Sequence, residues 1–485
     1  MVSDSMKVLT VVLVVVYFII CVAIALKTNK TNTTVKQYFI SGKNVGLFFL
    51  FFTCFASFCG SGNFIGYAGR TAVYGVGAYW NFMGDIVLGY IAFSIFLAPY
   101  LAKFDYITMP QFITHYLVGN DMTVRRLSGI SAAIGNIAIC GMQIMGMSYM
   151  FTAALGVQSH VAVIISGAIT VTYSAIGGMD GIILNDAIQG MLQLFVVVFV
   201  IVFSLKIMNF DLAWLFTEVN KVDPQLTTIW GGYTWKQCIS NFLTGFFGSM
   251  TNPIMWNRAF VAKDVKTAKS GFWLATAACI ICTFFVMSIG FLARVLNNDV
   301  GDQATIWMIV NQMPSWFLPF AVVGLTAAIM DTSAAHLNAG VANLVCDCID
   351  PDEKLPPKQS IRLSKTICFI SGAVAMVGAV VAPSLLDLSY LGLVILGATL
   401  FPVFIIGYFL RDKTSKEFRS NISIKAVRCA MLVGLIVTAC FQLIPSLADV
   451  IGGGIIPGML STTVIILVLN KVFKPEYPIV KEARE

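Results

Sequence analysis

The sequence predicts an all-α membrane protein, because it is strongly apolar and its apolar residues form long uninterrupted runs. Of its 485 residues, 58% are hydrophobic and only 11% are charged, and the mean hydropathy is +0.84. Ordinary soluble domains carry about 25% charged residues. Runs such as 8–26 and 192–205 are continuous, whereas the strands of an outer-membrane barrel alternate in polarity. A soluble enzyme and a barrel are therefore both excluded.

Thirteen apolar runs are long enough to cross about 30 Å of hydrocarbon as helices. They begin near Val8, Val45, Tyr74, Leu127, His160, Asn185, Ile239, Ser270, Ser315, Thr366, Leu386, Val427 and Asp449. With these runs as spans, 25 of the 31 Lys and Arg residues fall on one side, Arg258 among them. The positive-inside rule then predicts a plasma (inner) membrane protein with its N-terminus outside and its C-terminus in the cytoplasm. Nucleic acid is not expected as a partner, because no basic stripe carries interleaved aromatic residues.

Two of the runs contain residues that break a membrane helix. The second run carries Gly60 and Gly62 among small polar side chains, and the seventh carries Gly248, Asn252 and Pro253. Proline removes a backbone donor and small residues expose carbonyl groups, so we expect both segments to be partly unwound near mid-membrane. Broken runs that lie five apart are typical of two inverted repeats around a transporter's central site. The alternative is a pair of ordinary kinks packed against neighbouring helices.

Five motifs in a fixed order identify a known family. They are ASFCGSGNFIGYAG at 56–69, ITMPQF at 107–112, TYSAIGGMDGIILNDAIQ at 172–189, NPIMWNRAFVAKD at 252–264 and GLTAAIMDTSAAHLNA at 324–339. Together they resemble the sodium:solute symporter family, which includes bacterial sodium/proline and sodium/pantothenate symporters. The resemblance implies a LeuT-type five-plus-five inverted repeat that works by alternating access, and we expect it to function as a monomer. The implied parts are a first helix within 1–44, repeats over 45–235 and 236–410, and two peripheral helices in 411–485.

The resemblance also implies one sodium site between the second and ninth runs. Carried over by position, its ligands are the carbonyl groups of Ala56, Cys59 and Ala328 and the side chains of Asp331 and Thr332. Such oxygen ligands suit a hard cation. Asp331 departs from the family, whose compared members have serine there. A carboxylate buried in a membrane is costly and indicates a functional role, with a helix-packing salt bridge as the alternative. No Lys or Arg inside the predicted spans is its obvious partner.

Two further titratable residues lie in the matched motifs. Asp186 matches a family aspartate, and we expect it near the cytoplasmic mouth as an ion-exit or helix-end residue. His336 follows Asp331 by five residues, about 140° around a helix, and so lies on a different face. We expect a packed or interfacial histidine there rather than a proton relay. A proton-coupled symporter of the same fold that uses Asp331 is the alternative to sodium coupling.

Four polar residues are candidates for solute binding. Asn63 and Asn252 match positions that face the solute cavity in the family, and Gln143 is a weaker candidate; an amide binds carboxylate and hydroxyl groups alike. Positive half-helix ends favour a carboxylate, while Asp85 could receive an ammonium group or make a polar helix contact. Ile254 stands where sugar transporters have a gate tyrosine, which disfavours a sugar. We therefore expect sodium-coupled uptake of a small zwitterion, such as an amino acid, or of an organic carboxylate.

Other classes of membrane protein fit the sequence less well. Three scattered histidines, without an HExxH or GxSxG motif, do not make a catalytic constellation. A single asymmetric chain also lacks the repeated ring of a channel filter. The sequence thus predicts a transporter in a lipid bilayer, with Na⁺ as its bound ion.

Overall fold

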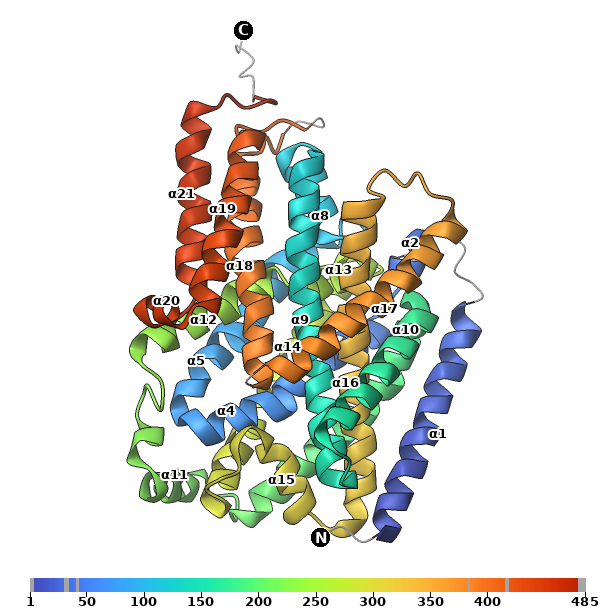
Figure 1. Cartoon of the computed structure of the whole chain (residues 1–485), viewed down its shortest axis with the longest axis vertical. Helices are drawn as coiled ribbons and strands as arrows, with labels where there is room; N and C mark the ends of the chain where they lie inside the picture. Colours follow the sequence, from blue (N-terminus) through green and yellow to red (C-terminus); the bar gives the residue numbers. More distant parts are fainter. Residues whose placement is uncertain (1–3, 30–34, 41–42, 383, 415–417, 479–485) are drawn as a thin grey trace.

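The computed structural model describes residues 4–29, 35–40, 43–382, 384–414 and 418–478, without the side chains of 28, 29, 35, 37 and 177–181. Within this part of the chain the secondary structure is helical, with two isolated β-bridges and no strand. The all-α prediction is confirmed. In Figure 1 the chain starts at one end of an elongated bundle and finishes at the other.

The first half of the chain forms α1 to α11. Their bounds are α1 Asp4–Asn29, α2 Val35–Ile40, α3 Leu47–Phe58, α4 Tyr67–Tyr74, α5 Tyr79–Phe82, α6 Tyr90–Ala92, α7 Ala98–Leu101, α8 Met109–Phe112, α9 Met122–Leu155, α10 Ser159–Ile207 and α11 Leu212–Val222. Short 3₁₀ or π segments join them: η2 Gly62–Gly66, η3 Gly75–Ala78, η4 Met83–Gly89, η5 Phe93–Leu97, η6 Ile113–Val118 and η7 Pro224–Thr227. The fifth and sixth apolar runs both lie in α10.

The second half forms α12 to α21. Their bounds are α12 Trp235–Met250, α13 Pro253–Val261, α14 Val265–Leu296, α15 Ala304–Asn311, α16 Leu318–Ala342, α17 Pro357–Val381, α18 Leu385–Leu410, α19 Ile424–Leu443, α20 Pro445–Ile451 and α21 Ile455–Val472. The short segments here are η8 Gly301–Gln303, η9 Ser315–Phe317 and η10 Asn343–Ile349.

Eleven stretches of the described chain are long and apolar enough to cross a membrane, against thirteen expected runs. The difference is explained by the second and seventh runs, because each is interrupted. The second run divides between α3, of 12 residues, and the segments that begin at Gly62. The seventh run divides into α12, of 16 residues, and α13, of 9 residues. The two segments expected to be broken are therefore broken.

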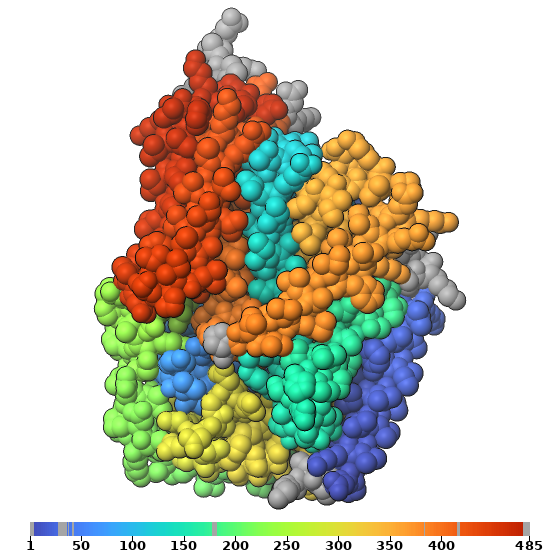
Figure 2. Space-filling view, viewed as in Figure 1, coloured from blue at the N-terminus to red at the C-terminus, as the bar shows by residue number. Residues whose placement is uncertain are grey.

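Burial separates central from peripheral helices. We compare the spans by the share of residues that is buried in the most apolar window of each. This share is 94% in the stretch that contains α16 and 83% in α9, but only 28% in α1 and 28% in α21. The exposed side chains of α1, such as Val8 and Val12, are apolar, as contact with lipid requires. Figure 2 shows α1 in blue and the pair α19 and α21 in red at opposite edges of one face. The broken helices pack against the buried central helices.

Two basic residues counted with the flanks are buried in the bundle. Arg258, counted with the cytoplasmic flank, is 1% exposed, and Arg70, counted with the opposite flank, is 5% exposed. Arg258 pairs with Asp186 and Arg70 with Asp387. A charge inside a bundle is tolerated when a carboxylate neutralises it.

Candidate functional site

The break in the second run lies at Cys59 and Gly60, between α3 and η2. Cys59 leaves the helical conformation, with φ −103° and ψ 50°. The backbone groups released by the break are taken up by glutamine side chains from two other helices: Ser61 N–H donates to Gln143 Oε1 at 2.8 Å, and Gln193 donates to the carbonyl oxygen of Cys59. Buried backbone groups need such partners. Gln143 thus supports the break as well as facing the cavity.

Gly60 is required for close packing at this break. A Cβ at this position would lie 2.7 Å from Gln143 Oε1 and 2.7 Å from Thr332 Oγ1, whereas a Cβ at Gly62 would meet Met142 at 3.3 Å. α3, α9 and α16 can therefore meet here only because residue 60 lacks a side chain.

The break in the seventh run lies at Thr251 and Asn252, between α12 and α13. Asn252 adopts an extended conformation, and its Oδ1 accepts a hydrogen bond from Ile254 N–H at 3.1 Å, which caps α13. Pro253 occupies the first turn, where a missing N–H costs nothing. Local sequence therefore positions this break, since Asn and Pro both favour a helix start at this point.

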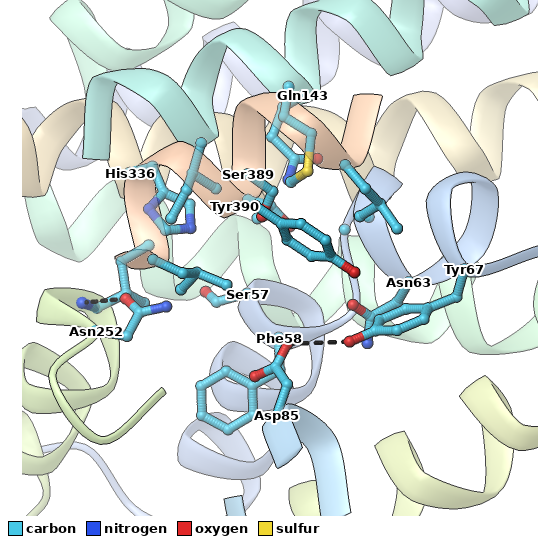
Figure 3. Close-up of a pocket in the computed structure, with 18 of the residues that line it drawn as sticks. Ser57, Phe58, Asn63, Tyr67, Asp85, Gln143, Asn252, His336, Ser389 and Tyr390 are labelled. Carbon is cyan, nitrogen blue, oxygen red and sulfur yellow. Dashed lines mark hydrogen bonds between the residues drawn. The ribbon is translucent and has the colours of Figure 1, made fainter. Parts of the chain in front are cut away.

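The two breaks face a common narrow cavity of about 50 Å³. Figure 3 shows Asn252, Ser57 and His336 on one side of it and Asn63, Tyr67 and Asp85 on the other, with Tyr390 between. Nine of the residues singled out from the sequence line it: Gly60, Gly62, Asn63, Asp85, Gln143, Asn252, Ile254, Thr332 and His336. All four predicted solute-binding residues are thereby brought together, although they come from α9, η2, η4 and the turn before α13.

The predicted sodium ligands form two neighbouring groups. Thr332 Oγ1 lies 3.0 Å from the carbonyl oxygens of both Ala56 and Ala328, so three oxygen atoms converge between α3 and α16. The carbonyl oxygen of Cys59 accepts a hydrogen bond from Gln193 instead. Asp331 is buried, and neither of its carboxyl oxygens has a hydrogen-bond donor among the described residues.

Asp331 lies beside Asp186, and both carboxyl groups are fully buried. Asp186 accepts hydrogen bonds from Thr53 and from Arg258, whose Nη2 lies 3.2 Å from its Oδ2. Arg258 also donates to Ser57 Oγ at 3.0 Å. A buried basic residue therefore lies beside these carboxyl groups, a partner that was not expected from the predicted spans. It pairs with Asp186, while the Asp331 carboxyl group lies against Asp186 and has no hydrogen bond from a Ser, Thr, Lys or Arg side chain among the described residues.

His336 lines the cavity and is held by a buried amide. Asn136 Nδ2 donates to Ala132 O at 2.9 Å, which orients the amide, and Asn136 Oδ1 lies 2.9 Å from His336 Nδ1. Since a carbonyl oxygen only accepts hydrogen bonds, Nδ1 carries the hydrogen. The neutral ring then presents an Nε2 lone pair to its surroundings.

Several residues of this site were missed by sequence reasoning. Tyr67, Ser249 and Tyr390 surround Asp85, and Gln193 and Arg258 complete the buried groups described above. Arg258 lies in the matched motif at 252–264, so its position was a usable signal. Tyr67 lies in the matched motif at 56–69 and was a usable signal as well, whereas contacts between distant helices bring Gln193, Ser249 and Tyr390 to the site.

The match to a known family decides the class of this protein. The model of the sodium:solute symporter family matches residues 38–417 of the chain. The chain belongs to the sodium:solute symporter family. It is therefore a membrane transporter and not an enzyme, and sodium is its coupling ion.

Relatives and solved structures agree with membership in the sodium:solute symporter family. A sodium/pantothenate symporter of Escherichia coli (strain K12) is 24% identical over 386 residues, which cover 75% of this chain and 77% of the relative. A sodium/proline symporter of Staphylococcus aureus is 22% identical over 353 residues, covering 70% and 68%. A solved Na⁺-coupled sialic acid symporter has a TM-score of 0.76 at 18% identity and covers 96% of this chain and 98% of its own. The LeuT-type fold is confirmed.

Proposed function

We propose that this member of the sodium:solute symporter family carries one small organic solute into the cell together with sodium, by alternating access around the cavity between the two broken helices. The observation that carries the proposal is the convergence of both breaks, from opposite halves of the chain, on one buried cavity with polar walls. Released backbone groups at mid-membrane are costly unless they serve a site. Asn63, Gln143, Asn252 and Asp85 are proposed to bind the solute.

The proposed sodium site combines the oxygen atoms around Thr332 with the carboxylate of Asp331. Carbonyl, hydroxyl and carboxylate oxygens match the preference of a hard cation, and two unpartnered carboxyl oxygens support the fit. Asp186 is proposed to act next to this site, on the path by which the ion leaves.

Ion pairs on either side of the cavity support alternating access between the repeats 45–235 and 236–410. Arg70 of α4 pairs with Asp387 at the start of α18, and Arg125 of α9 donates to Asp347 of η10, with 3.1 Å between Nε and Oδ1. Each pair joins different helices. Breaking one pair at a time would therefore open the cavity toward one side of the membrane. We propose that the protein works as a monomer in the plasma membrane, with its N-terminus outside and its C-terminus in the cytoplasm.

Flux into proteoliposomes tests the proposal. A panel of amino acids, amines and organic carboxylates is offered under a sodium gradient alone and under a pH gradient alone. We expect at least one solute to accumulate under the sodium gradient and to stop when the gradient is collapsed. Accumulation under a pH gradient without sodium would contradict the proposal and support the proton-coupled alternative that uses Asp331.

A further inference from the structure

The described walls of the cavity carry one acidic residue and no Lys or Arg. Among the described residues that line it, Asp85 is the only acidic one. Asp85 is partly accessible, whereas Asp186 and Asp331 are fully buried. A carboxylate that faces a cavity inside a membrane protein marks a substrate or ion pathway, and a cationic group offsets the cost of burying its charge.

The neighbours of Asp85 are neutral hydroxyl groups that it shares with other acceptors. Tyr67 OH lies 3.2 Å from Asp85 Oδ2 but 2.6 Å from Asn81 Oδ1. Ser249 Oγ contacts Asp85 Oδ1 and lies 2.6 Å from the carbonyl oxygen of Gly245. Each hydroxyl has one hydrogen to donate. These contacts orient the carboxylate without neutralising it.

Aromatic rings surround the same carboxylate. Phe58 and Tyr90 pack with ring centroids 4.9 Å apart, and Phe58, Tyr90, Tyr67 and Tyr390 all line the cavity. Figure 3 shows the rings of Phe58 and Tyr67 next to the Asp85 carboxylate, and the Tyr390 ring beside Tyr67. Aromatic faces attract ammonium groups, and more strongly when water is excluded.

An anionic group would find little to bind in this cavity. The start of α13 offers few donors, because Pro253 has no N–H and the N–H of Ile254 is capped by Asn252. Two arginines lie behind the walls and already have partners: Arg258 donates to Asp186 and to the wall residue Ser57, and Arg70 pairs with Asp387. Neutral amides and hydroxyl groups remain, and these hydrogen-bond any polar group, charged or not.

We propose that the solute is recognised through a protonated amine, which binds the Asp85 carboxylate within the rings of Phe58, Tyr67, Tyr90 and Tyr390. The inference rests on the proposed function and names its substrate class: small organic amines and amine-bearing zwitterions. A carboxylate on the solute is accommodated by the amides but is not required for binding. An organic acid without an amine is not a substrate.

Matched compounds separate the amine from the carboxylate. Each trio consists of an amino acid, the amine left when its carboxylate is removed and the acid left when its amine is removed: alanine, ethylamine and propionate; valine, isobutylamine and isovalerate; phenylalanine, phenethylamine and 3-phenylpropionate. Binding is measured as the rise in the melting temperature of the purified full chain in sodium-containing detergent buffer. We expect stabilisation by an amino acid and its amine in at least one trio, and by no acid. Stabilisation by acids alone, or by no amine and no amino acid, would overturn the inference.

Substitutions at Asp85 test whether this carboxylate is the partner. Asp85→Asn should weaken binding of the stabilising amine at least about thirtyfold, because it removes one member of a buried charge pair. Asp85→Glu should retain part of the affinity. The matched control is Asp264→Asn, at the exposed cap of α14, where Asp264 Oδ1 accepts from Thr267 N–H at 2.7 Å and asparagine caps equally well. It should leave amine binding unchanged.

Stabilisation by sodium alone reports whether the Asp85→Asn variant is folded. Sodium should still raise its melting temperature, since the proposed sodium ligands are other residues. Unchanged amine affinity in a folded Asp85→Asn protein would overturn the inference. Sodium-driven uptake of an acid or a neutral solute would overturn the inference and leave the proposed function standing, whereas the absence of any sodium-driven uptake would overturn the proposed function itself.

Discussion

Asp331 is the residue whose replacement tests the ion site most directly. Its two carboxyl oxygens lack hydrogen-bond donors among the described residues and lie beside Asp186. Protons and sodium should therefore compete for Asp331. We expect acidification to raise the apparent sodium constant for uptake without changing the maximal flux at saturating sodium.

Two variants of Asp331 separate a sodium ligand from a packing residue. Asp331→Ala should lose sodium dependence, and Asp331→Ser should restore a weaker but nearly pH-independent sodium response in the same flux assay. If Asp331→Ala keeps the sodium and pH dependence of the original protein, the carboxylate is a structural contact.

The buried Arg258–Asp186 pair leads to a prediction about the free energy of unfolding. Both side chains are buried, so Arg258→Met should leave an uncompensated carboxylate and destabilise the protein by about 3–5 kcal/mol. The double variant Arg258→Met with Asp186→Asn should recover part of this loss, because the unpaired charge is gone. Thermal unfolding in detergent measures both. A double variant less stable than Arg258→Met alone would contradict this account.

The broken helix depends on close packing, and two glycines at its ends provide a matched test. A Cβ at Gly60 would lie 2.7 Å from Thr332 Oγ1, while a Cβ at Gly46, at the start of α3, meets nothing within 4 Å. We expect Gly60→Ala to reduce sodium-driven uptake at least about tenfold by displacing Thr332 from the ion site. Gly46→Ala should transport normally. Equal uptake by both variants at equal expression would show that the close approach at Gly60 is dispensable.

Helices α9 and α19 are joined by an ion pair whose strength depends on pH. Asp121 caps α9 through Val124 N–H and pairs with Arg428. Partial burial would raise the pKa of Asp121, but the hydrogen bonds from Arg428 and Val124 outweigh it and lower that pKa. A carboxyl group whose pKa is lowered by folding stabilises the folded protein at pH values above its pKa in the unfolded chain, about 3.9. This stabilisation is lost as the pH falls through its pKa in the folded protein.

Asp121→Asn keeps the cap and removes the charge, so it tests this pair. It should destabilise by at most about 1 kcal/mol, because the pair is partly solvated. The difference in unfolding temperature from the original protein should stay constant between pH 7 and pH 5 and shrink below about pH 3.9. A difference that grows on acidification would contradict the assignment.

The complete transport cycle has a thermodynamic limit set by the number of coupling ions. One recognisable ion site indicates one sodium per solute. A tenfold sodium gradient supplies about 1.4 kcal/mol and 100 mV supplies about 2.3 kcal/mol. Together they support accumulation of a zwitterionic solute of zero net charge by about 500-fold. Proteoliposomes with negligible leak measure this ratio, and a plateau far above it would require a second ion.

Features that depend only on residues close together in the sequence could be predicted from the sequence. Hydrocarbon demands helices of a minimum length, so run lengths predicted the class of fold. The breaks were predicted as well, because Gly60 and Pro253 act on the backbone where they stand. The matched motifs supplied the family and the residues around Thr332. The burial and pairing of Arg258 were not predicted, since a flank and a paired interior site look alike in sequence.

Which polar groups meet was decided by tertiary structure alone. Thr332 reaches Ala56 across 276 positions of sequence, and Ser249 reaches Asp85 across 164. Arg258 lies 72 positions from Asp186 and pairs with it, and the carboxyl group of Asp331 lies beside that pair. Backbone breaks are local, so the sequence was sufficient to predict them. Charge balance in a buried site depends on helices that pack together from distant parts of the chain, and only the folded molecule shows which carboxylate Arg258 pairs with.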